Sequence, residues 1–388
     1  MTGLLVKESL FNMDESRTLL TYHDLTVEVE LTPGEELIDH MHSTVLGQPG
    51  GFRYQHTDLV ERLTAPGENY FMYLRKAGKM MGSVGFVGRP AEINGISFDS
   101  WLIRYFSIKA PMRSVPRKRK EKSDLKGDQK RSTVLGRFIQ PVFADPSQLR
   151  VKGADPNQPA IIYAAIEQKN LRSMNFSTQM GLETIGEMVG FTFSRINPKK
   201  SGRVERLPAA EYDAMLSMIG DFYQAYTLFV PDPIFNHGNY FVIREGGKVV
   251  AGIQYYPVTW RILDFGSGAA NWFIGLLSRL NWFRKRYNPK EMRLIAFDGI
   301  YCEDGFEDAL YELMEGVLKE AGVYLAFMMA DTTSGIWELF KKKKNLGIIH
   351  HVFGTKKADI RARFINLPGE VREQFLSRPT YIPTYDNS

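Results

Sequence analysis

Hydrophobic and polar residues along the first 200 positions form short blocks that predict β-strands with helices between them. Residues 24–31 alternate as in a half-buried strand, and residues 96–110 form one long strand-like run. Two further runs within 69–88 flank Ala77-Gly78-Lys79, which predicts a β-hairpin. Helices are expected at 34–46, at 57–64 and at about 133–143.

The most informative pattern is a succession of strand, helix and strand near the middle of the chain. The apolar run at 161–166 predicts a strand and stops at Glu167. A helix-like segment begins at Asn170 and ends at Gly181, eleven residues later, which is about three helical turns. A second apolar run at 185–193 predicts the strand that follows the helix.

The second half of the chain repeats this order of elements. A hairpin is expected at 240–258 around Gly246-Gly247. The later elements are a strand at 292–302, a helix at 306–322, a strand at 323–331, a helix at 334–345 and a strand at 347–354. Residues 195–208 are polar and contain two prolines, which is typical of a linker. The sequence therefore predicts two domains of similar topology, at 1–200 and 201–388.

The succession from 161 to 193, with its helix begun by Asn170, resembles the end of a GNAT acyltransferase domain. The repeated element order extends the resemblance over most of the chain as a tandem pair. The resemblance implies an α/β (α+β) fold with two GNAT-like domains. Each would hold a mixed, mostly antiparallel sheet flanked by helices.

The resemblance also implies a cofactor, acetyl-CoA or another acyl-CoA, and the residues that bind it. In the family, the Asn at the position of Asn170 contacts the cofactor. The thioester carbonyl is polarised by backbone N–H groups at the end of the fourth strand, here around Phe106, Ser107 and Ile108. The pyrophosphate is held at a helix start, where N–H groups and the helix dipole attract anions. That start falls at Arg131–Gly136, although Val134 replaces the middle Gly of the family motif.

The implied reaction is acyl-CoA-dependent N-acyl transfer, with acetyl transfer to an amine as its simplest form. The acceptor would be an amine of a small molecule or a peptide. Glu167, at the end of its strand, is the candidate base that takes the proton of the ammonium. The family places a Tyr, as general acid, seven residues after the Asn. Here that position is Ser177, which is a poor acid but can hold a water molecule.

The second half lacks these motifs. After the strand at 292–302 comes EDGFEDAL, with acids where a phosphate-binding Arg would stand. Negative charge at such a position opposes phosphate binding. We therefore expect a degenerate domain at 201–388 that shapes the substrate cleft.

Composition and charge limit the partners and the cellular compartment that we expect for the protein. Residues 113–131 hold nine Lys/Arg and three Asp/Glu, a net charge of +6, whereas the whole chain carries +5. The positive charge is local, so we expect no stable complex with nucleic acid. Cys302 is the only cysteine, which fits a reducing, cytoplasmic setting. Seven scattered histidines predict no metal site, and no apolar run is long enough to span a membrane.

Three other readings remain open. The missing Tyr and the Val134 substitution would also suit a GNAT-fold binding protein without catalytic activity. An acyl donor of the aminoacyl-tRNA kind is a further alternative for a tandem GNAT pair. The stretch ILDFGSGAA at 262–270 imitates the first motif of S-adenosylmethionine-dependent methyltransferases, with Asp298 as the later acid. The gap from Asp264 to Asp298 is 34 residues, longer than the roughly 20 of a dinucleotide-type unit.

One aromatic and basic stretch fits none of these motifs. NWFIGLLSRLNWFRKRY at 271–287 ends in Arg284, Lys285 and Arg286. It suits a helix that lies on a membrane surface or covers an acyl chain. The simpler interpretation, which we prefer from sequence, is a helix packed across a sheet or between the domains.

Overall fold

A computed structural model of the whole chain provides the structure. It describes residues 16–63, 67–108, 134–150, 155–231, 233–235, 238–266, 268–343, 345–381 and 383–387. The basic segment at 113–131, including the candidate phosphate ligand Arg131, lies outside the described residues.

The first half forms the elements that the hydrophobic pattern predicts. Its strands are β1 (Arg17–Tyr22), β2 (Leu25–Glu30), β3 (Phe52–His56), β4 (Glu68–Lys76), β5 (Lys79–Ile93), β6 (Ile96–Ile108), β7 (Ala160–Glu167) and β8 (Glu183–Ser194). Its helices are α1 (Glu35–Ser43), α2 (Leu59–Leu63), α3 (Val134–Ala144) and α4 (Leu171–Gln179). The hairpin turn between β4 and β5 is confirmed: Ala77 and Gly78 both have positive φ there, as a tight hairpin turn requires. The short strands β1 and β3 are additions that the sequence pattern did not reveal.

The second half confirms most of its predicted elements. Its strands are β9 (Glu205–Arg206), β10 (Tyr240–Glu245), β11 (Lys248–Phe265), β12 (Met292–Cys302), β13 (Leu325–Asp331) and β14 (Lys356–Ile365). The helices before β13 are α5 (Tyr212–Phe222), α6 (Gly268–Leu277), α7 (Asn281–Arg286) and α8 (Glu307–Glu320). The later helices are α9 (Gly335–Lys343), α10 (Ile348–Phe353), α11 (Gly369–Ser377) and α12 (Thr384–Asn387).

One prediction in this half is wrong. The apolar run at 347–354 is not a strand but the short helix α10, which Gly347 and Gly354 bracket with positive φ. The true strand, β14, follows it and buries the three consecutive residues from Ile360 to Ala362. A run of four to eight apolar residues does not distinguish a strand from a buried helix by periodicity.

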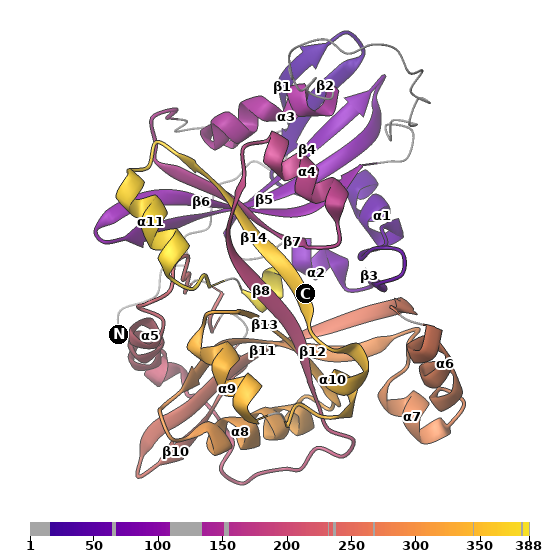
Figure 1. Cartoon of the computed structure of the whole chain (residues 1–388), viewed down its shortest axis with the longest axis vertical. Helices are drawn as coiled ribbons and strands as arrows, with labels where there is room; N and C mark the ends of the chain where they lie inside the picture. The colour runs from indigo at the N-terminus through magenta and orange to yellow at the C-terminus, as the bar shows by residue number, and fades with distance from the viewer. Residues whose placement is uncertain are drawn as a thin grey trace, which may run out of the picture.

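A single sheet carries all of these strands (Figure 1). Its order is β1-β2-β4-β5-β6-β7-β14-β8-β13-β12-β11-β10-β9, while β3 pairs with β11 off this path. Only the pairs β6–β7 and β12–β13 are parallel among the described strands. The predicted mixed, mostly antiparallel sheet flanked by helices is thus confirmed.

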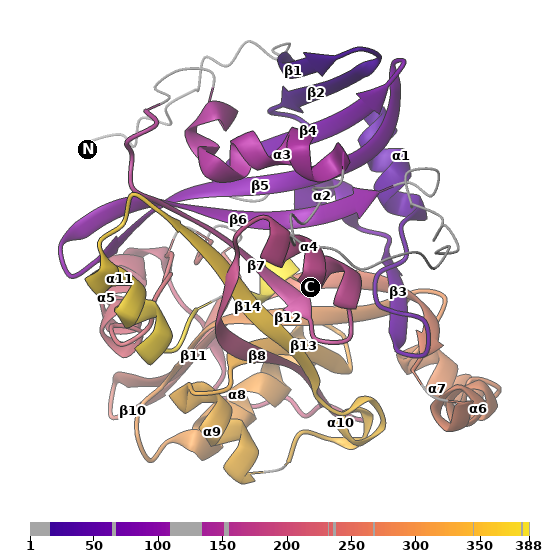
Figure 2. The ribbon, with the colours of Figure 1, turned by 45° about the horizontal axis from the view of Figure 1, so that its top comes forward.

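The centre of the sheet is built by an exchange between the two halves (Figure 2). β14, from the end of the chain, lies between β7 and β8, and β8 in turn lies beside β13. Each half therefore places its last strand next to the parallel pair of the other half. The division into domains at 195–208 stays a prediction, because the sheet continues across it.

Helices cover the sheet with apolar side chains. α3 packs Phe138, Ile139 and Val142 into a cluster with Trp101, whose side chain is completely buried. α8 buries Leu310, in a second cluster, against the sheet of the second half. Complete burial of such side chains stabilises a fold by roughly 1.5–3 kcal/mol each. The apolar clusters under α3 and α8 include side chains of β6 and β12, and they hold the ends of these two strands in fixed positions.

Candidate functional site

The two parallel strands β6 and β7 separate partway along their length. They are paired only as far as Leu102 and Tyr163, although β6 continues to Ile108 and β7 to Glu167. Beyond the last pair, no strand of the described residues lies along the facing edges. Their N–H and C=O groups are therefore available to an extended ligand that enters between the strands.

A β-bulge bends β6 where the strands separate. Ser83 pairs with Ser107 and Gly85 with Arg104, so one residue of β5 opposes two residues of β6. Tyr105, inside this bulge, has a φ of 52°. A non-glycine residue in this left-handed region costs on the order of 1–2 kcal/mol. Strain of this size is typical of sites where function requires an unusual backbone path.

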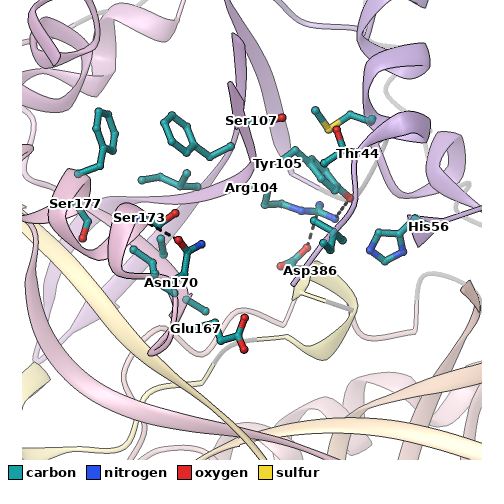
Figure 3. A pocket seen from close by; sticks show the side chains of 18 of the residues that line it. Thr44, His56, Arg104, Tyr105, Ser107, Glu167, Asn170, Ser173, Ser177 and Asp386 are labelled. Atoms are coloured by element: carbon teal, nitrogen blue, oxygen red, sulfur yellow. Dashed lines mark hydrogen bonds and ion pairs between the residues drawn. The ribbon is translucent and has the colours of Figure 1, made fainter. Parts of the chain in front are cut away.

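The space between the separated strands is a cavity of about 290 Å³. Figure 3 shows Glu167, Asn170, Ser173 and Ser177 on one side of it, and Arg104, Tyr105, His56 and Asp386 on the other. These side chains come from β7, α4, β6, β3 and α12. The cavity is close in size to the smaller pockets that hold ligands in proteins, which begin at roughly 300 Å³.

Five of the residues predicted from sequence line this cavity. They are Phe106, Ser107, Glu167, Asn170 and Ser177. Two other predicted residues lie elsewhere: Ile108 ends β6 opposite Gly82, and Gly136 is buried in the first turn of α3, away from the cavity lining. Their assignments to the cofactor, like that of Arg131, stay predictions.

Asn170 caps α4 with its side chain. Its Oδ1 accepts a hydrogen bond from the N–H of Ser173 at 3.1 Å, as an N-cap residue does. Its Nδ2 donates no hydrogen bond to the described part of the chain. Asn170 can therefore support the helix with one atom and contact a ligand with the other.

Ser177 is buried and its hydroxyl is already engaged. The Oγ donates to the carbonyl oxygen of Met174 at 2.8 Å. It can still accept a hydrogen bond from a water molecule, but its proton is committed to the backbone. Directly before it in the helix, Phe176 stacks on Phe106 at 4.9 Å between ring centres, so the ring pair joins α4 to β6 across the cavity.

His56 is a candidate base that the sequence analysis missed. It lines the cavity from β3, where it pairs with Trp260 of β11, and only 7% of it is exposed. Its Nδ1 lies 3.7 Å from Oδ1 of Asp58, longer than a direct hydrogen bond, and its Nε2 donates to no described residue. Burial lowers the pKa of His56 below its ordinary value, and the charge of Arg62 lowers it further, against the opposing effect of Asp58.

Asp58 is held as an anion behind His56. Its Oδ2 accepts hydrogen bonds from Nε of Arg62 at 3.1 Å and from the N–H of Thr259 at 3.0 Å. Burial alone would raise the pKa of Asp58, but its interactions with His56 and Arg62 outweigh burial and lower it. The fixed carboxylate faces one ring nitrogen of His56 and leaves the other for the cavity.

Asp386 lines the floor of the cavity as part of a buried ion cluster. Its carboxylate lies 2.6 Å from Arg89 and 3.3 Å from Arg104, and all three side chains are at most 3% exposed. Burial would raise the pKa of Asp386, but the two guanidinium groups outweigh it and hold the pKa below its ordinary value. Arg104 also donates to the hydroxyl of Tyr105 at 2.6 Å.

The corresponding space in the second half is filled by the protein itself. β12 and β13 also separate, after Ala296 and Phe327, but only about 30 Å³ remains between them. The segment before α12 occupies the place, and Tyr381 donates a hydrogen bond to Asp298 at 2.6 Å. Burial raises the pKa of Asp298 to about 6. The described structure therefore leaves one ligand-sized space between parallel strands.

Asp264 has a structural role that differs from the methyltransferase interpretation. Its Oδ1 accepts hydrogen bonds from the N–H of Gly266 at 2.8 Å and from Nδ2 of Asn271 at 2.9 Å, which shapes the turn into α6. Asp264 lies near the end of β11, which is antiparallel to β3, β10 and β12. A methyltransferase motif requires a parallel, doubly wound sheet, so the structure removes this alternative.

The described residues contain no group of three or more side chains suited to a metal ion. Among the same residues, no helix is both long and apolar enough to cross a membrane.

Comparison with known proteins identifies the fold. No family model matches the sequence, and no curated protein does either. The crystal structure of Saccharomyces cerevisiae N-myristoyltransferase with bound myristoyl-CoA matches with a TM-score of 0.53 at 10% identity, over 90% of this chain and 85% of that one. Another structure of that enzyme, with bound myristoyl-CoA and inhibitors, gives 0.54 at 12% identity, over 90% and 82%. The two matches extend over both halves of the chain and show a GNAT-like fold, as the sequence predicts.

Proposed function

We propose that the protein is an acyl-CoA-dependent N-acyltransferase that transfers an acyl group to an amine. The observation that carries this proposal is the separation of β6 from β7 around a cavity that also receives the start of α4. The bound myristoyl-CoA of the structurally similar enzyme supports an acyl-CoA as the donor. Acetyl-CoA and longer acyl-CoA both remain within the proposal, as do small-molecule and peptide amines.

The separated strands suit the pantetheine arm of coenzyme A. The arm is extended and carries two amide groups, which can pair with the unpaired edges of β6 and β7 as a short strand would. Nδ2 of Asn170 would donate to the arm where β7 and α4 diverge. Such pairing would place the thioester beside the bulge at Tyr105.

The backbone of β6 would stabilise the transition state. Amine attack on the thioester carbon forms a C–N bond and places negative charge on the carbonyl oxygen. An N–H group near Phe106, Ser107 or Ile108 would donate a hydrogen bond to that oxygen, as an oxyanion hole does. The bulge holds this stretch of β6 in one conformation before the substrate arrives.

Two groups lining the cavity could take the proton of the attacking amine, His56 and Glu167. We favour His56, because its lowered pKa keeps the imidazole neutral near pH 7 and its Nε2 is not bound to a described residue. Asp58 would stabilise the imidazolium once it forms. Glu167 remains the second candidate, as the carboxylate at the end of β7.

The departing sulfur needs a proton when the C–S bond breaks. Tyr105 is the best-placed donor, since its hydroxyl accepts from Arg104 and keeps its own proton. Ser177 cannot supply this proton without losing its bond to Met174, so we assign it the weaker role of holding a water molecule. Coenzyme A and the N-acylated amine would then leave the cavity.

An assay of thiol release tests the proposed reaction. The protein would be mixed with acetyl-CoA or longer acyl-CoA and with panels of small amines and peptides. The proposal predicts release of free coenzyme A that depends on an amine and yields the matching amide. Binding of acyl-CoA without amine-dependent release across broad panels would favour the non-catalytic alternative.

Replacing Asn170 tests its two roles separately. Asn170→Ala should lower the free energy of unfolding by about 1 kcal/mol, because α4 loses its cap. It should also raise the dissociation constant for acyl-CoA several-fold, as expected for one neutral hydrogen bond. Asn170→Ser is the matched control, since a serine hydroxyl keeps the cap but offers no amide donor. An Asn170→Ser variant with normal affinity would show that Asn170 only supports the helix.

A further inference from the structure

The helices α6 and α7 form a short hairpin at the outer edge of the molecule. Both views show the pair standing away from the body of the sheet, beyond the end of β11 (Figures 1 and 2). One side of the hairpin is anchored, because Ile274 and Phe283 are each 3% exposed and pack in a cluster with Phe265 and Phe353.

The other side of the hairpin exposes large apolar side chains. Trp272 is 71% exposed and Trp282 is 45% exposed, together with Leu276 and Leu280 at 45% each. Trp272 and Leu276 are four residues apart and therefore lie on one face of α6. A helix packed across a sheet or between the halves would have buried these rings, so that prediction from sequence is wrong for the outer face.

Exposed apolar residues are concentrated in this part of the described chain. Of the twelve large hydrophobic residues that are exposed, five lie in the twenty positions from 263 to 282. They are Leu263, Trp272, Leu276, Leu280 and Trp282. Scattered single residues of this kind are normal on a protein surface, whereas a cluster marks a site of interaction.

The hairpin itself, between Asp264 and Glu291, carries only positive charge. Residues 265–290 contain no Asp or Glu but include Arg279, Arg284, Lys285, Arg286 and Lys290. Arg279, Arg284 and Lys285 are exposed, and none of the three forms an ion pair with a described acidic residue. Arg286 instead lies over the rings of Trp282 and Tyr324, at 5.9 and 5.1 Å from their centres.

We propose that the hairpin α6–α7 binds the surface of a membrane that contains anionic phospholipids. Tryptophan rings favour the boundary between headgroups and acyl chains, where an apolar body and a polar N–H are both satisfied. Arginine and lysine beside them attract anionic headgroups, each contributing about 1 kcal/mol near such a surface. The ten residues of α6 are too few to span a bilayer, so the hairpin lies in the interface plane.

The charge pattern argues against two other occupants. In a symmetric dimer through this face, the basic side chains of two copies would lie close to each other and repel. An apolar acyl chain alone would not explain exposed Arg and Lys beside the Trp rings that form no ion pair with a described acidic residue. A surface that is apolar and anionic at once accounts for both features.

Docking through the hairpin would orient the candidate active site. β3 carries Tyr54 and His56 of the cavity and pairs with the last residues of β11, which lead into α6. The pairing runs from His56–Trp260 to Phe52–Phe265, four residues along β3 or roughly 13 Å. The cavity would then lie close to the bilayer surface, where amphiphilic substrates gather.

Sedimentation with lipid vesicles tests the docking, and its outcome does not depend on acyl transfer. The full chain would be mixed with vesicles of phosphatidylcholine alone or of equimolar phosphatidylcholine and phosphatidylglycerol. We expect binding to the anionic vesicles that weakens with added salt, with a blue shift of tryptophan emission. Equal binding to both vesicle types, or to neither, would overturn the proposal.

Two double variants identify the surface. Trp272→Ser with Trp282→Ser, and separately Arg284→Glu with Lys285→Glu, should each reduce partitioning to anionic vesicles by about tenfold or more. Lys79→Glu with Lys248→Glu, at two hairpin turns elsewhere, makes the same change in net charge and should have a smaller effect. Unchanged melting temperatures would show that the variants remain folded.

Two results would assign the hairpin to another partner. If both hairpin variants bind anionic vesicles as strongly as the wild type does, the lipid contact lies elsewhere on the protein. Sedimentation velocity without lipid that shows a dimer, with the Trp272→Ser and Trp282→Ser variant monomeric, would mean that a second copy covers this face.

Discussion

Replacing His56 with glutamine should lower the turnover of acyl transfer by about 10²- to 10³-fold and leave acyl-CoA affinity almost unchanged. Glutamine fills a similar volume but cannot accept the proton that the attacking amine must lose. Nε2 of His56 forms no hydrogen bond with a described residue, so the loss should appear in kcat and not in binding. Steady-state kinetics and calorimetric titration of the same variant provide the two measurements.

The pH profile adds a signature that a structural role would not produce. The base acts in its neutral form, and burial lowers the pKa of His56 below its ordinary value of about 6.5. In the wild type, kcat/KM should therefore fall as pH decreases through this lowered pKa and stay level above it. This fall of kcat/KM at low pH should be absent in His56→Gln. If Glu167→Gln abolishes the fall at low pH while His56→Gln preserves it, Glu167 and not His56 is the base.

Replacing Asp386 with alanine should lower the free energy of unfolding by about 3–5 kcal/mol. The change leaves Arg89 and Arg104 buried without their counter-ion, and both side chains are at most 3% exposed. The cost arises from uncompensated charge, and not from the net strength of the ion pairs. Urea unfolding, followed by circular dichroism, gives the difference between variant and wild type.

The effect should depend on pH in a defined direction. Because the folded state holds the pKa of Asp386 below its ordinary value, the carboxylate contributes stability above the unfolded pKa of about 3.9. That stability is lost as pH falls through the folded pKa. Glu291→Ala is the matched control, since its ion pair with Arg293 is exposed and should be worth less than about 1 kcal/mol. Similar losses in the two variants would contradict the account of the buried cluster.

Local pattern was sufficient to predict much of the fold. The strand at 161–166 and the helix begun by Asn170 depend on apolar runs and a capping residue that are neighbours in sequence. Hairpins at Gly78 and Gly246 were equally clear, because their turns require positive φ. β14 was missed because its place between β7 and β8 is fixed by pairing partners almost 200 residues away, which no local periodicity encodes.

The candidate site likewise contains residues that the sequence could predict and residues that it could not. Phe106 and Glu167 lie on successive strands of one half and Asn170 begins the next helix, so a family pattern could place them at one cavity. His56 and Asp386 could not be found from sequence, because each reaches the cavity through long-range contacts. His56 depends on the pairing of β3 with β11 from the other half. Asp386 depends on burial of α12 against Arg89, 297 residues earlier.

Calorimetric titration with acyl-CoA, on the wild type and on a variant with a filled cavity, tests whether the cavity between β6 and β7 binds the acyl donor. We expect the wild type to bind one acyl-CoA per chain, since the second space between parallel strands is already occupied. Ala165→Phe, on β7 at the cavity wall, should weaken binding about tenfold or more. Leu376→Ala, on the exposed face of α11, should bind as the wild type does. Absent binding in the wild type, or unchanged affinity in a folded Ala165→Phe variant, would contradict the assignment of this cavity.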